Sequence, residues 1–173
     1  MKQIIIKPLE DYKKDLEYFR SNNYLLVEVD FENISNDREF FKIFASKLNF
    51  PKYFGWNLNA FNECLLDLSW LGKIKVVVLI KNLEKIFDKA LLPVLLREFI
   101  EAYNFHKLNN HEFLTFIFMD RKDNKEIVSQ IKKAYIERRK RDSQFMLDAN
   151  FNNLYGETKK EMKNKFTGKI ARL

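Results

Sequence analysis

An alternation of apolar and polar side chains predicts a strand over residues 24–31, followed by a helix. Glu28 and Asp30 lie on one side of the strand, and the apolar side consists of Leu25, Val27, Val29 and Phe31. Ser35 or Asn36 can cap the helix that follows. Its apolar positions recur every three or four residues, at Phe40, Phe41, Phe44 and Leu48.

A second helix is predicted after Pro51 and Gly55, which interrupt the regular pattern. Asn57 can cap it through the side-chain oxygen. Its apolar face consists of Leu58, Phe61, Cys64, Leu65 and Leu68. Asn59, Glu63 and Asp67 are spaced four residues apart on the other face, so they form one polar row.

Two nearly unbroken apolar runs, residues 75–80 and 113–119, are typical of interior strands that are covered on both faces. A helix is predicted between them, over residues 89–105, because Pro93 is tolerated near a helix start. Its buried stripe consists of Leu92, Leu95, Leu96, Phe99 and Tyr103. Arg97, Glu98 and Glu101 lie away from that stripe, so this helix could add carboxylates to those of the preceding helix.

The order of these elements predicts an α/β fold with a small three-stranded parallel sheet packed by helices. The segment 1–23 is an N-terminal extension that could supply an edge strand or a leading helix. Residues 24–120 form the predicted domain. An amphipathic pattern continues past residue 120, so 121–173 is predicted as a basic, helical C-terminal extension.

Composition supports a folded protein, because 46% of the 173 residues are hydrophobic. Cys64 is the only cysteine, which excludes an internal disulfide and a cysteine-based zinc site. Its place on an apolar helix face is typical of a small buried hydrophobic residue. The apolar run at the start has only three isoleucines, too few for a signal peptide or a membrane span, so we expect a cytoplasmic protein.

The net charge of +7 is unevenly distributed along the chain. Residues 121–173 hold 15 Lys and Arg against 7 Asp and Glu, a net charge of +8, and the rest is nearly neutral. The basic run Arg138, Arg139, Lys140 and Arg141 is most often a solvated helix end, but it also supports a hypothesis of nucleic-acid binding through this extension.

Residues suited to catalysis are scarce. His106 and His111 are the only histidines, and neither has a partner at the spacing of a metal site or a catalytic triad. The chain contains no glycine-rich phosphate loop. We therefore expect a protein that is not an enzyme and needs no metal or cofactor.

The stretch FPKYFGWNLNAFNECLLDLSWL resembles the barstar family of intracellular ribonuclease inhibitors. The order of elements over residues 24–120 agrees with that family. The resemblance rests on a loop followed by a helix, at Pro51, Tyr53, Phe54, Gly55, Asn57, Leu58, Ala60, Cys64 and Leu65.

The resemblance implies an inhibitor that inserts this loop and helix into the active site of a ribonuclease, which could be a toxin against which the protein gives immunity. Asn59 and Glu63 correspond to two aspartates that face the enzyme's cations, and Glu101 corresponds to a glutamate of a later helix. Here the chain departs from the family, because Asn59 is uncharged and Glu63 is one methylene longer. The predicted contact surface comprises Tyr53, Gly55, Trp56, Asn57, Asn59, Glu63, Asp67 and Glu101.

Simpler interpretations exist for several of these residues. A row such as Asn59, Glu63 and Asp67 is usually an ordinary solvated helix face, and only the family resemblance favours a binding role. Phe54 and Trp70 are predicted to be core residues. For Trp56, a place in the core and a place on the contact surface are equally compatible with the pattern.

Overall fold

The computed structural model describes residues 4–72, 74–120, 125–137 and 140. The chain divides into two compact units, residues 1–134 and 135–173. The first unit contains the whole sheet. Residues 125–134 are helical and bury Ile127, Ile131 and Ala134. In the second unit, the described residues 135–137 and 140 are helical.

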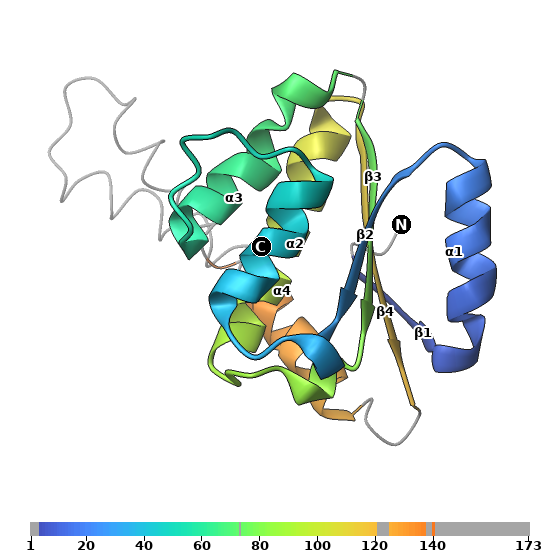
Figure 1. Ribbon diagram of the computed structural model, residues 1–173. Coiled ribbons are helices and arrows are strands. Elements are labelled where there is room, and N and C mark those ends of the chain that lie inside the picture. Colours follow the sequence, from blue (N-terminus) through green and yellow to red (C-terminus); the bar gives the residue numbers. More distant parts are fainter. Residues whose placement is uncertain (1–3, 73, 121–124, 138–139, 141–173) are drawn as a thin grey trace, which may run out of the picture. The chain divides into compact units, whose positions relative to one another are not determined.

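Strands and helices alternate along the first unit (Figure 1). The strands are β1 (Ile4–Pro8), β2 (Leu25–Asp30), β3 (Lys75–Lys81) and β4 (Glu112–Met119). The helices that connect them are α1 (Tyr12–Ser21), α2 (Asp37–Lys47), α3 (Leu58–Asp67) and α4 (Leu91–Leu108). Short 3-10 turns lie at Leu9–Asp11, Phe31–Asn33, Ser69–Leu71 and Leu83–Lys85.

The sheet is parallel and four-stranded, in the order β1-β4-β3-β2. The prediction of a parallel sheet packed by helices is confirmed, but the predicted number of three strands is wrong. Residues 4–8 form the fourth strand by pairing with β4, with Ile4 opposite Thr115 and Pro8 opposite Met119. A run of three isoleucines is too short to reveal a strand by its periodicity, and only the neighbouring strand supplies its hydrogen-bond partners.

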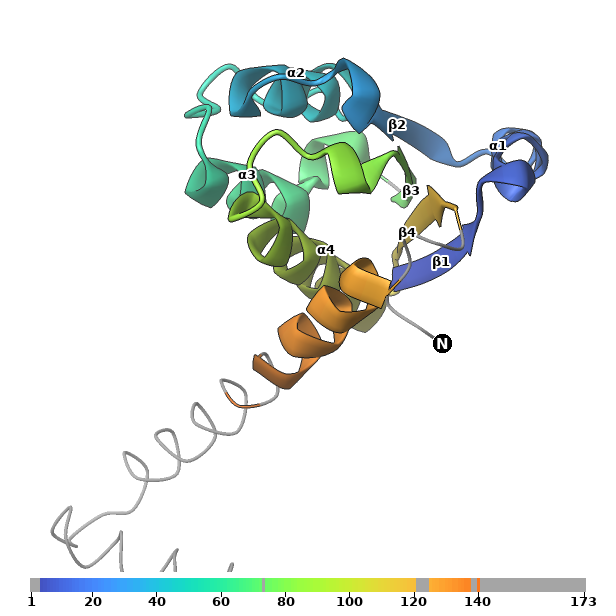
Figure 2. The same cartoon turned by 90° about the horizontal axis from the view of Figure 1, so that it is seen from below.

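Helices cover both faces of the sheet, with α1 on one face and α2, α3 and α4 on the other (Figures 1 and 2). The chain crosses the sheet in one direction from β1 to β2 and returns through β3 to β4. Because crossovers between parallel strands are right-handed, the reversal of direction requires the helices to lie on opposite faces.

The face under α1 is packed by Phe19, whose side chain joins Val77, Leu79, Phe116 and Phe118 in one buried cluster. On the opposite face, phenylalanines join α2 to α3. The ring of Phe61 in α3 lies 5.4 Å from those of Phe40 and Phe41 and 5.0 Å from that of Phe44. These contacts fix the buried side of α3 and therefore determine which side faces solvent.

Candidate functional site

Two side-chain hydrogen bonds of Asn57 help to hold the loop before α3. The Asn57 side-chain oxygen accepts a hydrogen bond from the backbone N–H of Ala60 at 2.9 Å, which caps the first turn of α3 as predicted. Its Nδ2 atom donates to the Gly55 carbonyl at 3.1 Å. A Cβ added at Gly55 would lie 3.1 Å from Asn57 Nδ2, so the compact turn favours glycine there.

Three aromatic residues of this loop differ in their exposure to solvent. The prediction that Phe54 belongs to the core is confirmed, because its side chain is only 5% exposed. Tyr53 is 78% exposed, and Trp56 is 39% exposed with its ring 5.1 Å from that of Phe54. The backbone of Trp56 has a φ of 53°, in the left-handed region. The loop therefore presents Tyr53 and part of Trp56 to solvent, while Phe54 anchors it.

The polar row of α3 faces solvent along its length. Asn59, Glu63 and Asp67 are all exposed. Asp67 also accepts a hydrogen bond from the backbone N–H of Ser69 at 3.3 Å, just beyond the helix end. The opposite side of the helix is buried, including Cys64, for which burial raises the thiol pKa. This cysteine is therefore a packed residue, not a reactive thiol.

Helix α4 lies beside α3 on the same face of the sheet (Figures 1 and 2). Glu101 on α4 is partly exposed. Glu98 was expected to lie away from the buried stripe, and that prediction is wrong, because Glu98 is 5% exposed and pairs with Arg97 at 3.1 Å. The spacing of the buried stripe does not predict the burial of Glu98, because Glu98 lies at the margin of that stripe. The charge of Arg97 compensates for the buried carboxylate.

A residue that the sequence analysis did not single out, Arg38 in the first turn of α2, also contacts the loop. Its guanidinium carbon lies 4.8 Å from the centroid of the Trp56 ring. The two residues are 18 positions apart, so no periodicity in the sequence connects them. Arg38 and Trp56 meet only because the phenylalanine contacts pack α2 against the loop and α3.

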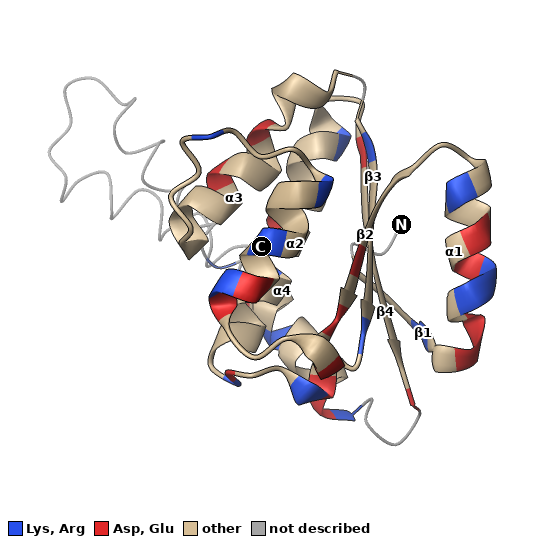
Figure 3. Ribbon diagram, viewed as in Figure 1, with Lys and Arg blue, Asp and Glu red and all other residues tan. Residues whose placement is uncertain are grey.

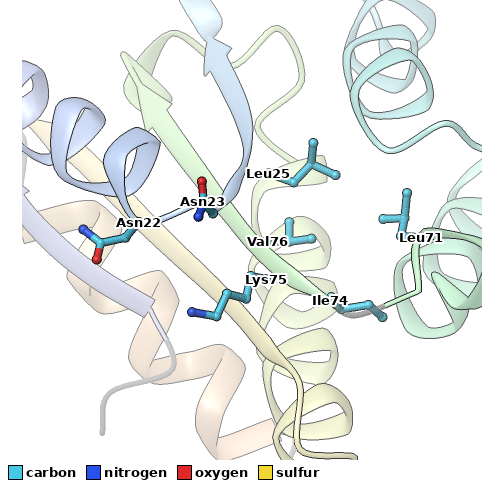
Figure 4. Close-up of a pocket in the computed structure, with 7 residues that line it drawn as sticks. All are labelled: Asn22, Asn23, Leu25, Leu71, Ile74, Lys75 and Val76. Atoms are coloured by element: carbon cyan, nitrogen blue, oxygen red, sulfur yellow. The ribbon is translucent and has the colours of Figure 1, made fainter.

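Two cavities lie at opposite ends of the sheet. One, of about 530 Å³, is lined by Asn57 and Leu58 together with Asp37, Asp88 and Leu91, where α2, α3 and α4 begin. The other, of about 430 Å³, lies at the start of β2 and β3 and is lined by Asn23, Leu25, Lys75 and neighbouring residues (Figure 4). None of the predicted contact residues lines this second cavity, so only the first adjoins the loop and α3.

Neither a metal-binding cluster nor a membrane-spanning helix is found in the described part of the chain. No group of three or more His, Cys, Asp or Glu side chains within it is arranged to hold a metal ion. Among the same residues, no helix has both the length and the apolar character required to cross a membrane. Arg138, Arg139 and Arg141 of the predicted nucleic-acid surface lie outside the described residues, whereas Lys140 is exposed.

Comparison with known proteins assigns the central part of the chain. The family model described as barstar, the barnase inhibitor, matches residues 24–113, just over half of the chain. The match contains the loop, α3 and Glu101. No curated protein matches the chain. The chain therefore belongs to the barstar family.

Proposed function

We propose that this protein binds a ribonuclease and covers its active site with the 53–57 loop, α3 and Glu101, without catalysing a reaction. The family match supports a barstar-like inhibitor. The observation that carries the proposal is the exposure of Glu63 in the middle of the polar row, next to a loop that exposes Tyr53 and Trp56. We assign the binding function to the segment 24–120, with 1–23 and 121–173 as extensions.

Electrostatics favours this surface as a substitute for bound RNA. A ribonuclease active site gathers cationic side chains to hold phosphate, and a carboxylate accepts paired hydrogen bonds from them as phosphate does. Glu63 and Asp67 supply such carboxylates, and Asn59 supplies a neutral acceptor. The aromatic side chains of Tyr53 and Trp56 add apolar area that a base-binding pocket could cover.

The proposal is tested by inhibition of a panel of purified small ribonucleases that cleave a fluorogenic RNA oligonucleotide. The full chain is compared with Glu63→Lys. We expect the substitution to weaken binding by on the order of 2 kcal/mol or more, about 30-fold in Kd, because it places a cation against the enzyme's own cations. Inhibition should be competitive with RNA, since both occupy the same site.

A matched control is Glu17→Lys, the same charge change at an exposed position of α1 on the other face of the sheet. This variant should inhibit as well as the unmodified chain. Inhibition that is lost equally in both variants would indicate a general charge effect. Inhibition that survives Glu63→Lys would contradict the proposed contact surface.

The basic extension supports a second candidate function, nucleic-acid binding, because residues 121–173 carry a net charge of +8. Replacement of Arg138, Arg139, Lys140 and Arg141 by glutamine tests it through the mobility shift of a single-stranded RNA oligonucleotide. Binding by this run should weaken steeply with salt, disappear in the four-fold variant and be unaffected by Glu63→Lys.

A further inference from the structure

The stacked pair of Arg38 and Trp56 places a cation within the proposed contact surface. The guanidinium carbon lies 4.8 Å from the centroid of the indole ring, within the range of a cation–π contact. Both residues are exposed. Among the described residues, the salt bridges do not include Arg38, although Asp37 and Glu39 flank it in the chain.

Acidic and basic residues lie side by side where α2 begins, and α3 carries acidic residues (Figure 3). Arg38 lies between Asp37 and Glu39 in the chain, and all three are exposed. Glu63 and Asp67 of α3 are exposed as well. Arg38 is thus a cation among carboxylates, and a partner with cations everywhere would meet a like charge there.

The stacked geometry determines what Arg38 can still bind. A guanidinium that lies over an aromatic ring keeps its N–H donors at the edge of its plane, where they can form two parallel hydrogen bonds with one carboxylate. If a partner covered Arg38 without supplying an acceptor, a charged group would be buried without hydrogen bonds, which is costly. Complementarity therefore requires an anionic group opposite Arg38.

We propose that Arg38, held against Trp56, selects ribonucleases that present a carboxylate beside the cations that contact Glu63. This inference rests on the proposed function and specifies the kind of ribonuclease that fits. Arg38 acts as a specificity-determining residue through its charge, and Trp56 keeps its guanidinium oriented toward the partner.

The test uses Arg38→Glu in the full chain, with each ribonuclease that the unmodified chain inhibits as the probe. A carboxylate opposite Arg38 predicts that Kd rises by about 30-fold or more, because an attractive charge pair becomes a repulsive one. A uniformly cationic partner predicts the opposite sign, a lower Kd. An unchanged or lower Kd would overturn the inference while leaving the proposed function intact.

Lys42→Glu is the matched control, because Lys42 is exposed one helical turn after Arg38 and the charge change is the same. Its effect on Kd should be several-fold smaller. If both variants changed Kd equally, the total charge of α2 would determine the affinity, and not the pair of Arg38 and Trp56. That result would overturn the inference. If no ribonuclease is inhibited, the proposed function and this inference both fail.

A measurement without a partner tests the stack itself. In a Trp70→Phe background, Trp56 is the only tryptophan, so its quenching by neutral acrylamide reports access to the indole. Arg38→Ala removes the side chain that lies over the ring, and we expect quenching to rise by about twofold. Quenching that does not respond to Arg38→Ala would overturn the contact between the two side chains and the inference built on it.

Discussion

His106 on α4 donates a hydrogen bond from Nε2 to the backbone carbonyl of Leu65 on α3, at 2.7 Å. The imidazole is fully buried and stacks on Phe113, with the ring centroids 5.5 Å apart. The bond joins α3, which carries the exposed polar row, to the helix that carries Glu101. The histidine therefore serves as a structural link between the two helices of the proposed contact surface.

This link should make the stability of the protein depend on pH. Burial lowers the pKa of His106 from its usual value of 6.5. Its Nδ1 atom is buried and finds no hydrogen-bond partner among the described residues, so a second proton there would lack an acceptor. As pH falls below about 6.5, the unfolded chain binds a proton that the folded chain resists, and the free energy of unfolding decreases.

Urea denaturation at about pH 7.5 and pH 5.5 checks this prediction. His106→Gln should be less stable than the unmodified chain at the higher pH and should lose most of the difference between the two conditions. His111→Gln should retain most of that difference, because burial lowers the His106 pKa more than the charge of His111 does. If the free energy of unfolding changed equally between the two pH values in all three proteins, the pH dependence would come from carboxylates and not from His106.

The cap of α3 should contribute to stability as well as to the shape of the loop. Asn57→Ala removes the acceptor for the Ala60 N–H, which should lower the free energy of unfolding by about 1 kcal/mol. Asn57→Asp keeps the acceptor and adds a negative charge where the helix dipole favours one, so stability should be preserved. Thermal or urea unfolding measures both. A loss of stability in Asn57→Asp as large as in Asn57→Ala would show that the Nδ2 bond to Gly55 matters more than the cap.

Local patterns in the sequence were sufficient to predict α2, α3, α4 and three of the strands. For residues 1–23 an edge strand and a leading helix were left as alternatives, and the segment forms both, β1 and α1. The caps Asn36 and Asn57 both accept the predicted kind of hydrogen bond, from Glu39 and Ala60. The polar row of α3 is exposed as its four-residue spacing indicates. These features depend on residues close together in the chain, where periodicity and capping rules apply.

Features that depend on distant residues were not predictable in this way. The fourth strand, β1, forms by pairing with β4, which lies more than 100 residues later in the chain. The contact of Arg38 with Trp56 arises from packing between a helix and a loop. For Trp56, the sequence was compatible with core and surface alike, and the ring is in fact partly exposed.

Helix α1 lies before the segment that the family model matches, and we expect it to be required for stability. Phe19 contributes the buried aromatic ring of this helix to the cluster with Phe116 and Phe118. Phe19→Ala should lower the free energy of unfolding by about 3 kcal/mol or more, since it leaves a cavity over the sheet. The neighbouring Tyr18 is 58% exposed, so Tyr18→Ala should cost much less.

Urea unfolding of Phe19→Ala and Tyr18→Ala measures the free energy of unfolding of each variant. The comparison shows whether stability depends on the buried ring of Phe19 or on any aromatic side chain of α1. Phe19→Ala should also leave the Kd for an inhibited ribonuclease unchanged wherever the protein is folded, because α1 lies on the face of the sheet opposite α3. Similar, small losses of stability in both variants would mean that α1 packs only loosely. A weaker Kd for folded Phe19→Ala would show that the two faces of the sheet are coupled, since removing a side chain on one face would then alter the surface presented by the other.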